Sequence, residues 1–395
     1  MHSLLTELVT PHPHPWFTHR IYHIFQSNLA DIKSNLADIT HHPVVVSPPR
    51  SCNLGSEDLS NFLADEPVPG QHTLCFAGKQ LNIFRTSTTS QPDLHHQLTA
   101  GERWSQLKAQ LEATLFLKNR RYPVQAWALF TKDGERIVDE DYQGQDDSKI
   151  LKMIQDAGIV LLFEGGQWIW PGIQKGFTRQ VRLDYVPSKG YDRIEKRNAT
   201  LVTLSLNPLV LSVQGFLSED ECNYIQEAAT PDMKYSDVTL MDKDKGRPAS
   251  DFRTSQSTFL GGTKLKDLEG IDLRTSSLVR IPRSHQEYVQ VLRYGNTEKY
   301  NAHMDFFDPR QYQNDPNTMR MIEHGKKNRL ATVFWYLSDV PKGGETIFPR
   351  ADKGPHPRNT ADCSVGLKVK PERGKVSLRF HTAKRLANCQ RFSCF

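Results

Sequence analysis

The chain has 395 residues, of which 37% are hydrophobic and 24% are charged, a composition typical of a globular protein with two or three domains. The net charge of +5 comes without a basic helix or an RNA-binding signature, so we expect no nucleic-acid partner. No run of about 18 apolar residues occurs, so we expect no membrane-spanning helix. The six cysteines form no CxxC pair, and their number does not indicate the redox compartment.

Residues 1–100 read as a loosely ordered N-terminal region. Prolines and histidines cluster at 11–15 and 41–49, and 86–99 is rich in the Ser, Thr and Pro of a linker. The first residues lack a basic segment followed by an apolar one, which is the pattern of a secretory signal peptide. A cytoplasmic location is therefore expected if this N-terminus is genuine.

Residues 101–175 predict a small α+β domain of unknown role. Trp104, Leu107, Leu111 and Leu115 recur at helical spacing, which predicts a helix over 102–118. Residues 125–138 read as two strands joined at Asp133-Gly134, a typical hairpin turn. A short helix over 148–157 and a buried strand over 158–165 complete this unit.

A third domain is predicted over 200–395. After an apolar strand, Ser218 and Glu221 have the spacing of a capping box at the start of a helix, and Pro231 ends that helix. Short strands then dominate, at 289–295, 330–340, 343–348 and 374–380. Such strands with Gly and Pro turns predict a β-sandwich or jelly roll with helices on one face.

His303 and Asp305 are the candidate metal ligands. Residues two apart in a strand point to the same face, so this imidazole and this carboxylate converge. Two histidines and one carboxylate, with open positions beside them, are what a non-haem iron(II) oxygenase needs. An HxD pair alone is common, so its surroundings decide what it indicates.

These surroundings resemble one family over about 170 residues. The segments are GFLSEDECNYI (215–225), DFRTSQSTFL (251–260), QVLRYGNTEKYNAHMDFF (290–307), TVFWYLSDVPKGGETIFP (332–349) and VKPERGK (369–375). In this order they resemble the catalytic domain of the prolyl 4-hydroxylase alpha family. The resemblance implies a double-stranded β-helix, which is a jelly roll with flanking helices. It also implies an iron(II)- and 2-oxoglutarate-dependent dioxygenase that hydroxylates peptidyl proline, with ascorbate keeping the iron reduced.

The resemblance also implies roles for individual residues. His303 and Asp305 match the first two iron ligands, Tyr294 matches a tyrosine that contacts 2-oxoglutarate, and Thr332 lines the pocket of this cosubstrate. The positions that border the peptide groove are Arg253, Ser255, Tyr300 and Arg329. The implied partner is a proline-containing peptide or protein, and the family location is the endoplasmic reticulum.

The C-terminal part departs from the family pattern. The family has a second iron-binding histidine about twenty residues after the GKV-type strand, and a lysine for the distal carboxylate of 2-oxoglutarate about ten residues later. Neither motif occurs, and the basic tail 381–395 looks unrelated to the sequence before it, so we expect the domain to be C-terminally incomplete. His381 is a candidate for the missing ligand and Arg391 for the carboxylate anchor, whereas His324 and His356 lie in polar loops and are weaker candidates.

Two functions remain open from the sequence. The first is an active peptidyl-proline hydroxylase. The second is a catalytically inactive, truncated relative that binds peptides through the groove at 253–300. The intact HxD pair and Tyr294 favour the first function, and the missing histidine and lysine favour the second.

Overall fold

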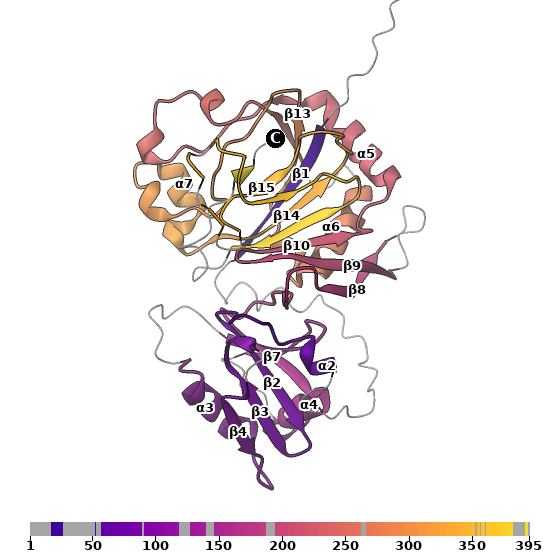
Figure 1. The fold of residues 1–395 in the computed structure, drawn as a ribbon, viewed down its shortest axis with the longest axis vertical. Helices are drawn as coiled ribbons and strands as arrows, with labels where there is room; N and C mark the ends of the chain where they lie inside the picture. Colours follow the sequence, from indigo (N-terminus) through magenta and orange to yellow (C-terminus); the bar gives the residue numbers. More distant parts are fainter. Residues whose placement is uncertain are drawn as a thin grey trace, which may run out of the picture.

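The computed structural model describes residues 17–26, 52, 57–88, 91–117, 127–139, 146–186, 194–261, 266–351, 354–355, 357–359, 361–381 and 392–393. They form two units, a smaller one on a six-stranded sheet and a larger one on a nine-stranded sheet with a three-stranded sheet beside it (Figure 1). The ladders between the described strands are antiparallel, which agrees with the expected mixture of helices and antiparallel sheets. No helix among the described residues has both the length and the apolar character needed to cross a membrane.

The smaller unit is a six-stranded sheet with the strand order β4-β3-β2-β7-β5-β6. Its core joins Trp104, Leu107 and Leu111 of the first long helix to the sheet, so the apolar side of that helix is buried as its spacing predicts. The elements are α2 (Glu57–Ser60), β2 (Gln71–Ala77), β3 (Gln80–Phe84), β4 (Leu94–Gln97), α3 (Trp104–Thr114), β5 (Trp127–Thr131), β6 (Arg136–Asp139), α4 (Asp147–Ala157) and β7 (Ile159–Glu164).

This unit begins earlier in the chain than the boundary at residue 100 suggests. The helices and the hairpin expected after residue 100 are present, but β2, β3 and β4 complete the same sheet. The interpretation of 86–99 as a linker is wrong for Leu94–Gln97, because these residues pair with β3 over four positions. This pairing is between separate strands, so the composition of the segment alone did not indicate it.

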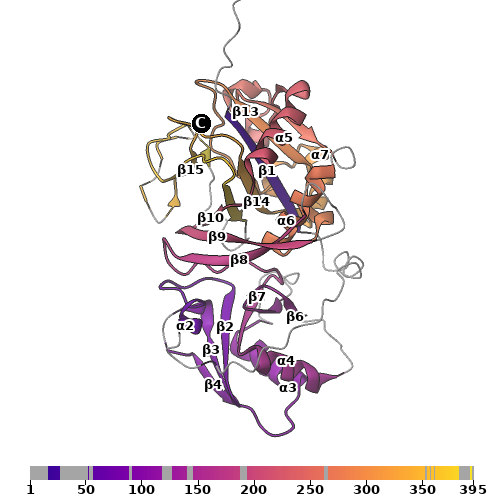
Figure 2. The same ribbon diagram turned by 90° about the vertical axis from the view of Figure 1, so that its right-hand side faces the viewer.

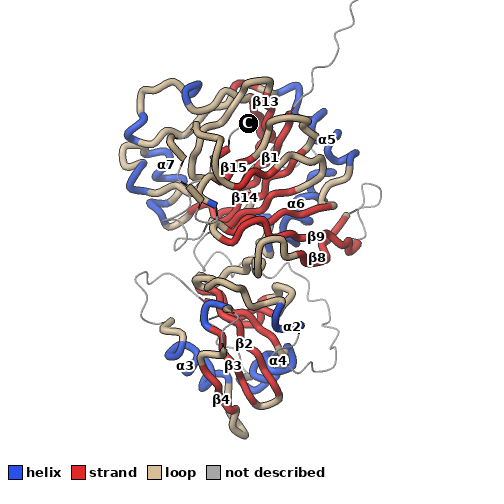
Figure 3. The backbone as a smooth tube through the Cα atoms, in the orientation of Figure 1, coloured by secondary structure: helices blue, strands red, loops and turns tan. Residues whose placement is uncertain are grey.

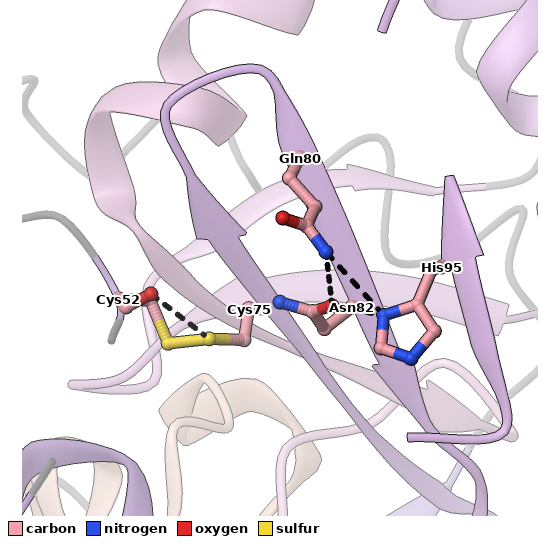
Figure 4. Close-up of a disulfide and its surroundings, with 5 residues drawn as sticks. All are labelled: Cys52, Cys75, Gln80, Asn82 and His95. Carbon is pink, nitrogen blue, oxygen red and sulfur yellow. Dashed lines mark hydrogen bonds between the residues drawn. A yellow bond between two sulfur atoms is a disulfide. The ribbon is translucent and has the colours of Figure 1, made fainter. Parts of the chain in front are cut away.

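A disulfide between Cys52 and Cys75 attaches residue 52 to β2 (Figure 4). The backbone amide of Cys52 also donates a hydrogen bond to the carbonyl of Phe76, at 3.0 Å. Beside the disulfide, Asn82 accepts a hydrogen bond from Gln80 and contacts His95 of β4. The cysteine spacing had left this pairing open.

The larger unit is a nine-stranded sheet with the order β11-β12-β13-β1-β14-β17-β10-β9-β8. The strands expected at 289–295, 330–340 and 374–380 are present in this sheet with shifted bounds, and the one expected at 343–348 lies in the three-stranded sheet. Strands β8 and β9 extend the nine-stranded sheet to residues before 200. The strands are β1 (Phe17–Gln26), β8 (Thr178–Tyr185), β9 (Glu195–Leu206), β10 (Leu209–Gln214), β11 (Lys234–Tyr235), β12 (Gln256–Leu260), β13 (Val289–Tyr294), β14 (Asn328–Tyr336) and β17 (Val376–Phe380).

Strand β1 lies in the middle of this sheet, although it comes from the start of the chain. It pairs with β13 from Phe17 to Ile21 and with β14 from His19 to Gln26. In Figure 1 the indigo β1 crosses the sheet between strands coloured orange and yellow. The expectation of a poorly ordered N-terminal region is therefore wrong for Phe17–Gln26. The other residues before 52 lie outside the described part of the chain.

Helices cover one face of the large sheet, and the three-stranded sheet faces the other (Figure 3). Helix α5 (Glu219–Ala229) begins with the predicted capping box, in which Ser218 and Glu221 exchange hydrogen bonds of 3.1 and 2.8 Å. The remaining elements are α6 (Lys266–Val279), α7 (Pro316–Met321), β15 (Thr346–Phe348), β16 (Leu367–Val369) and β18 (Phe392–Ser393).

The two units meet below β8 and β9 in Figure 2. Trp168 and Trp170 contribute contacts to both units. The Trp168 ring meets Phe130 and Phe163 of the small sheet at 5.7 and 5.3 Å, and it meets Trp170 at 5.3 Å. The indole nitrogen of Trp170 donates to the carbonyl of Leu278 in α6, at 2.6 Å. The hydrophobic core therefore continues from one unit into the other.

Candidate functional site

The site lies on the face of the large sheet that is turned toward β15. In β14, Val333 and Trp335 belong to the core against the helices, whereas Phe334 and Tyr336 share a second core with Phe348 of β15. Side chains alternate between the two faces of a strand, so Thr332 lies on the same face as Phe334. We call this side the pocket face.

Tyr294 is on the pocket face at the end of β13. It is buried and belongs to the core that contains Phe334, Tyr336 and Phe348. The sequence predicts that Tyr294 and Thr332 share a cosubstrate pocket, and the structure puts both on the same side of one sheet. Their roles in binding stay a prediction.

His303 and Asp305 converge, although they do not lie in the strand that the spacing argument assumed. The Nε2 atom of His303 lies 3.2 Å from Oδ1 of Asp305, and only 2% of Asp305 is exposed. They lie in the irregular segment after β13 and not in one of the named strands. A buried carboxylate needs compensation by a cation or by hydrogen-bond donors, so this pair is a candidate centre for a positive ion.

The backbone fixes the tautomer of His303. Its Nδ1 atom lies 2.8 Å from the carbonyl oxygen of Asn301, which only accepts hydrogen bonds, so the proton is on Nδ1. In the neutral ring, Nε2 then presents a lone pair toward the carboxylate of Asp305 at 3.2 Å. Two acceptors directed at one point fit a metal ion between them, and this orientation by the second ring nitrogen is usual for metal-binding histidines.

Thr332 holds the other oxygen of Asp305. Its hydroxyl donates to Oδ2 of Asp305 at 2.7 Å, and its oxygen lies 2.8 Å from Nε2 of His381. Because the single hydroxyl proton goes to the carboxylate, Nε2 of His381 must donate to Thr332. A chain of two hydrogen bonds thus runs from His381 through Thr332 to Asp305.

His381, the candidate third ligand, lies close to Asp305. It is 4% exposed, and its Nε2 atom lies 3.6 Å from Oδ2 of Asp305. The described residues contain no group of three His, Cys, Asp or Glu side chains arranged to hold a metal ion. Nε2 of His381 contacts Thr332 at 2.8 Å. Two donors therefore fit iron as they stand, and the third fits once Nε2 of His381 releases its proton.

The other candidates contribute less. His324 is exposed in a short 3₁₀ turn at Glu323–Gly325. His356 and Arg391 lie outside the described residues.

Three of the predicted groove residues form a connected set beside His303. The guanidinium of Arg253 donates to the hydroxyl of Ser255 at 2.7 Å and lies 4.6 Å from the ring centre of Tyr300. The Tyr300 ring stacks on His303 with 3.8 Å between centres and 19° between planes. These contacts link the predicted groove directly to the predicted ligand.

Arg329 makes a different contact. Its Nε and Nη2 atoms donate to the two carboxylate oxygens of Glu287, at 2.7 and 3.0 Å. Burial opposes the charge of Arg329, but the carboxylates of Glu287 and Asp305 outweigh it and raise the pKa of Arg329 above its usual value. The carboxylate of Glu287 thus holds the Arg329 side chain in place near the start of β14. Contact of Arg329 with substrate stays a prediction.

Comparison with known proteins shows which family the chain belongs to. The model of the 2OG-Fe(II) oxygenase superfamily matches residues 289–394. The Arabidopsis thaliana protein named "Probable prolyl 4-hydroxylase 10" is 37% identical over 234 residues, which cover 56% of this chain and 75% of that protein. The chain belongs to the prolyl 4-hydroxylase family.

Two further Arabidopsis thaliana members of this family are "Probable prolyl 4-hydroxylase 4" and "Prolyl 4-hydroxylase 2". Each is 34% identical over 186 residues, which cover 45% of this chain and 58% of that protein. The chain thus spans less than two thirds of the length of these two relatives. The match to the superfamily includes most of the tail that the sequence alone set apart.

Sequence reasoning missed part of the site. The Asn301 carbonyl is a backbone group, and no residue pattern reports it. The closeness of His381 to Asp305 was not predicted, because the family pattern has a loop between the strand at 374–380 and the third ligand. Alternation along the end of β17 was the available signal, because Ser377, Arg379 and His381 fall on one face.

Proposed function

We propose that the chain is an iron(II)- and 2-oxoglutarate-dependent dioxygenase that converts peptidyl proline to 4-hydroxyproline, with release of succinate and carbon dioxide. The observation that carries the proposal is the convergence of His303 and Asp305, with Nδ1 of His303 held by Asn301. Membership of the prolyl 4-hydroxylase family supports the choice of proline.

His303 and Asp305 would hold the iron, and His381 is the proposed third ligand. Bound iron would supply the redox chemistry that couples decarboxylation of 2-oxoglutarate to hydroxylation. The carbonyl of Asn301 keeps the proton of His303 on Nδ1, and Thr332 keeps Asp305 from rotating away. On binding the metal, His381 would give up its Nε2 proton and its bond to Thr332.

The cosubstrate would lie on the pocket face beside Thr332 and Tyr294. Two observations support a double-stranded β-helix around the cosubstrate. The large sheet has a hydrophobic core on each face, and the three-stranded sheet lies over the pocket face. The buried apolar neighbours Phe334, Tyr336 and Phe348 exclude water from this space. Exclusion of water strengthens each polar contact to the bound dicarboxylate.

The peptide would approach from the side of Arg253, Ser255 and Tyr300. The stacking of Tyr300 on His303 supports this direction, because it puts the groove against the reacting centre. Arg253 can donate hydrogen bonds to peptide carbonyls, while Ser255 holds its Nε atom in place.

Two associated proposals have weaker support. Ascorbate as a reductant follows from the family alone. A secretory location, with the endoplasmic reticulum as the family precedent, is supported by the Cys52–Cys75 disulfide, since disulfides persist in oxidising compartments. The inactive peptide-binding alternative is not favoured, because the site residues converge on one point.

The test is succinate release from 2-oxoglutarate with iron(II), ascorbate and a proline-rich peptide, with detection of 4-hydroxyproline. We expect turnover by the native chain and by His324→Ala, a histidine control in an exposed turn. We expect a loss of at least about 100-fold in His303→Ala and His381→Ala, because metal ligands are removed. Folded native chain without turnover would contradict the proposal, and full activity of His381→Ala would remove His381 from the ligand set.

A further inference from the structure

Residues 198–200 form the tripeptide Asn-Ala-Thr, which has the pattern of an N-glycosylation acceptor. No other asparagine in the chain is followed two positions later by serine or threonine. One tripeptide of this kind is common by chance. The position of Asn198 in the fold and the compartment of the chain therefore decide what it indicates.

Asn198 lies at the margin of the large sheet, near the start of β9. It pairs with Arg182 of β8, whereas the pairing of β9 with β10 covers only residues from Thr200 onward. Strand β8 is itself the last strand in the order of this sheet. The start of β9 and the end of β8 thus form a two-stranded extension at the lower margin of the larger unit in Figure 1.

The side chain of Asn198 points to solvent. Ala199 and Leu201 belong to the core against the helices, so Asn198 and Thr200 lie on the opposite face of the strand. Asn198 is exposed, and so is Arg182 across the pair. A large polar group attached to Asn198 would therefore extend into solvent without displacing a side chain of the core.

The compartment that glycosylates asparagine is oxidising, and the chain carries a feature of such a compartment. Cys52 and Cys75 form a disulfide, and both residues are buried. Disulfides form and persist in the lumen of the endoplasmic reticulum and are rare in the cytosol. The disulfide belongs to the smaller unit and the tripeptide to the larger one, so the two observations are independent and indicate the same compartment.

We propose that Asn198 carries an N-linked oligosaccharide, acquired in the lumen of the endoplasmic reticulum from a lipid-linked oligosaccharide diphosphate. Nδ2 of Asn198 forms a bond with the anomeric carbon of the first sugar, the bond from this carbon to the diphosphate breaks, and the amide loses one proton. The hydroxyl that the acceptor pattern requires belongs to Thr200, on the same face of β9 as the amide. The inference rests on the secretory location proposed above and not on the proposed activity.

The alternative is a fortuitous tripeptide in a chain that folds in the cytoplasm. Asn198 would then stay an unmodified polar residue on a solvated strand. The two alternatives differ in the mass of residue 198, which can be measured directly.

The experiment expresses the full chain in a eukaryotic cell and compares the purified protein before and after treatment with peptide-N-glycosidase in heavy-oxygen water. This enzyme removes the oligosaccharide and converts its asparagine into an aspartate that carries heavy oxygen. We expect the native chain to lose the mass of one oligosaccharide and to carry the label at position 198. Asn198→Gln and Thr200→Ala should show neither the loss of mass nor the label.

Three controls accompany these variants. Thr200→Ser keeps the acceptor pattern and should remain glycosylated. Asn359→Gln replaces an exposed asparagine outside the pattern, so it should lose the same mass as the native chain. A second form of the native chain has the signal peptide of a secreted protein before Met1, which delivers it to the endoplasmic reticulum whatever its own targeting.

An unlabelled native chain would overturn the inference, and the form with the signal peptide would show why. Label at residue 198 in that form alone would mean that the strand is accessible but that the chain does not enter the secretory pathway, so the secretory location would fall as well. Absence of label from both forms would mean that the tripeptide is not an acceptor. Label that persists in Asn198→Gln would assign the oligosaccharide to another residue. The proposed function is judged separately, by succinate release.

Discussion

The hydroxyl of Thr332 connects Asp305, the proposed acidic ligand, to the rest of the candidate site. It donates to Asp305 and accepts from His381, and both neighbours are buried. Thr332→Val keeps the shape of the side chain and removes both hydrogen bonds. We expect this variant to bind manganese(II) about 10- to 100-fold more weakly, because groups that orient metal ligands usually have effects of this size. Competition with a chelating dye measures the affinity.

Thr332→Ser is the matched control, because it keeps the hydroxyl and loses only a methyl group. It should bind manganese(II) within about threefold of the native chain. If the valine variant bound the metal as tightly as the serine variant, the hydroxyl would have no part in positioning Asp305.

Cys222 gives a prediction about pH. Burial raises the pKa of this thiol to about 11, although Arg373 nearby favours the thiolate. Below this pKa the thiol stays protonated, so at pH 8 we expect alkylation at least about 100-fold slower than for an exposed cysteine. Mass spectrometry after iodoacetamide treatment locates the label. Rapid labelling of Cys222 in the folded chain, without prior unfolding in urea, would contradict its burial in α5.

Local spacing predicted the centre of the site, and long-range pairing determined the rest. His303 and Asp305 are two residues apart, so their convergence is a local property of the backbone. His381 reaches Asp305 because β17 pairs with β14, and Ala331 lies opposite Phe380 in that pairing. The register between strands so far apart in the chain is set by the whole sheet and not by either segment.

Strand β1 gives the prediction at the level of elements. It has neighbours on both sides, and Ile21 lies opposite Gln290 of β13 and Phe334 of β14. A proline inside a central strand removes a ladder hydrogen bond and is tolerated mainly at edges. We expect Ile21→Pro to destabilise the large sheet by about 3 kcal/mol or more, measured by urea unfolding.

Ile21→Val serves as the control, since valine keeps the backbone amide and suits a strand. Its effect should stay near or below about 1 kcal/mol. A loss of β1 would expose the edges of β13 and β14, so the proline variant should also aggregate more readily. Equal stability of the proline and valine variants would show that β1 does not occupy this position in solution.

Elements with a local signature were predictable. Helix α5 begins at the capping box of Ser218 and Glu221, and the β5–β6 hairpin turns at Asp133-Gly134. The positions of β1 and β4 had no such signature, because each is defined by the strand beside it. The segment that contains β1 also includes histidines and an arginine, which weakened the apolar alternation expected of a central strand.

On the scale of the whole molecule, one hydrophobic core extends from the six-stranded sheet to the nine-stranded sheet. The cluster contains Phe62 and Phe163 of the smaller unit, together with Val181 and Leu278 of the larger one, and Trp170 lies where they meet. Arg280 adds a polar link, since its Nη2 atom donates to the carbonyl of Asp133 at 2.8 Å. Units that share a core of this kind should unfold together, because the loss of one exposes the apolar surface of the other.

We therefore expect a single calorimetric transition for the native chain and two separate transitions for Trp170→Ala. The substitution removes a buried indole and its hydrogen bond to Leu278, and tryptophan-to-alanine changes in cores cost about 3–5 kcal/mol. Trp170→Phe keeps most of the apolar contact and lacks the hydrogen bond, so it should lower the melting temperature and retain a single transition. One transition in all three proteins would mean that the tryptophan is not needed for coupling. Two transitions already in the native chain would mean that the smaller unit folds independently of the candidate catalytic unit.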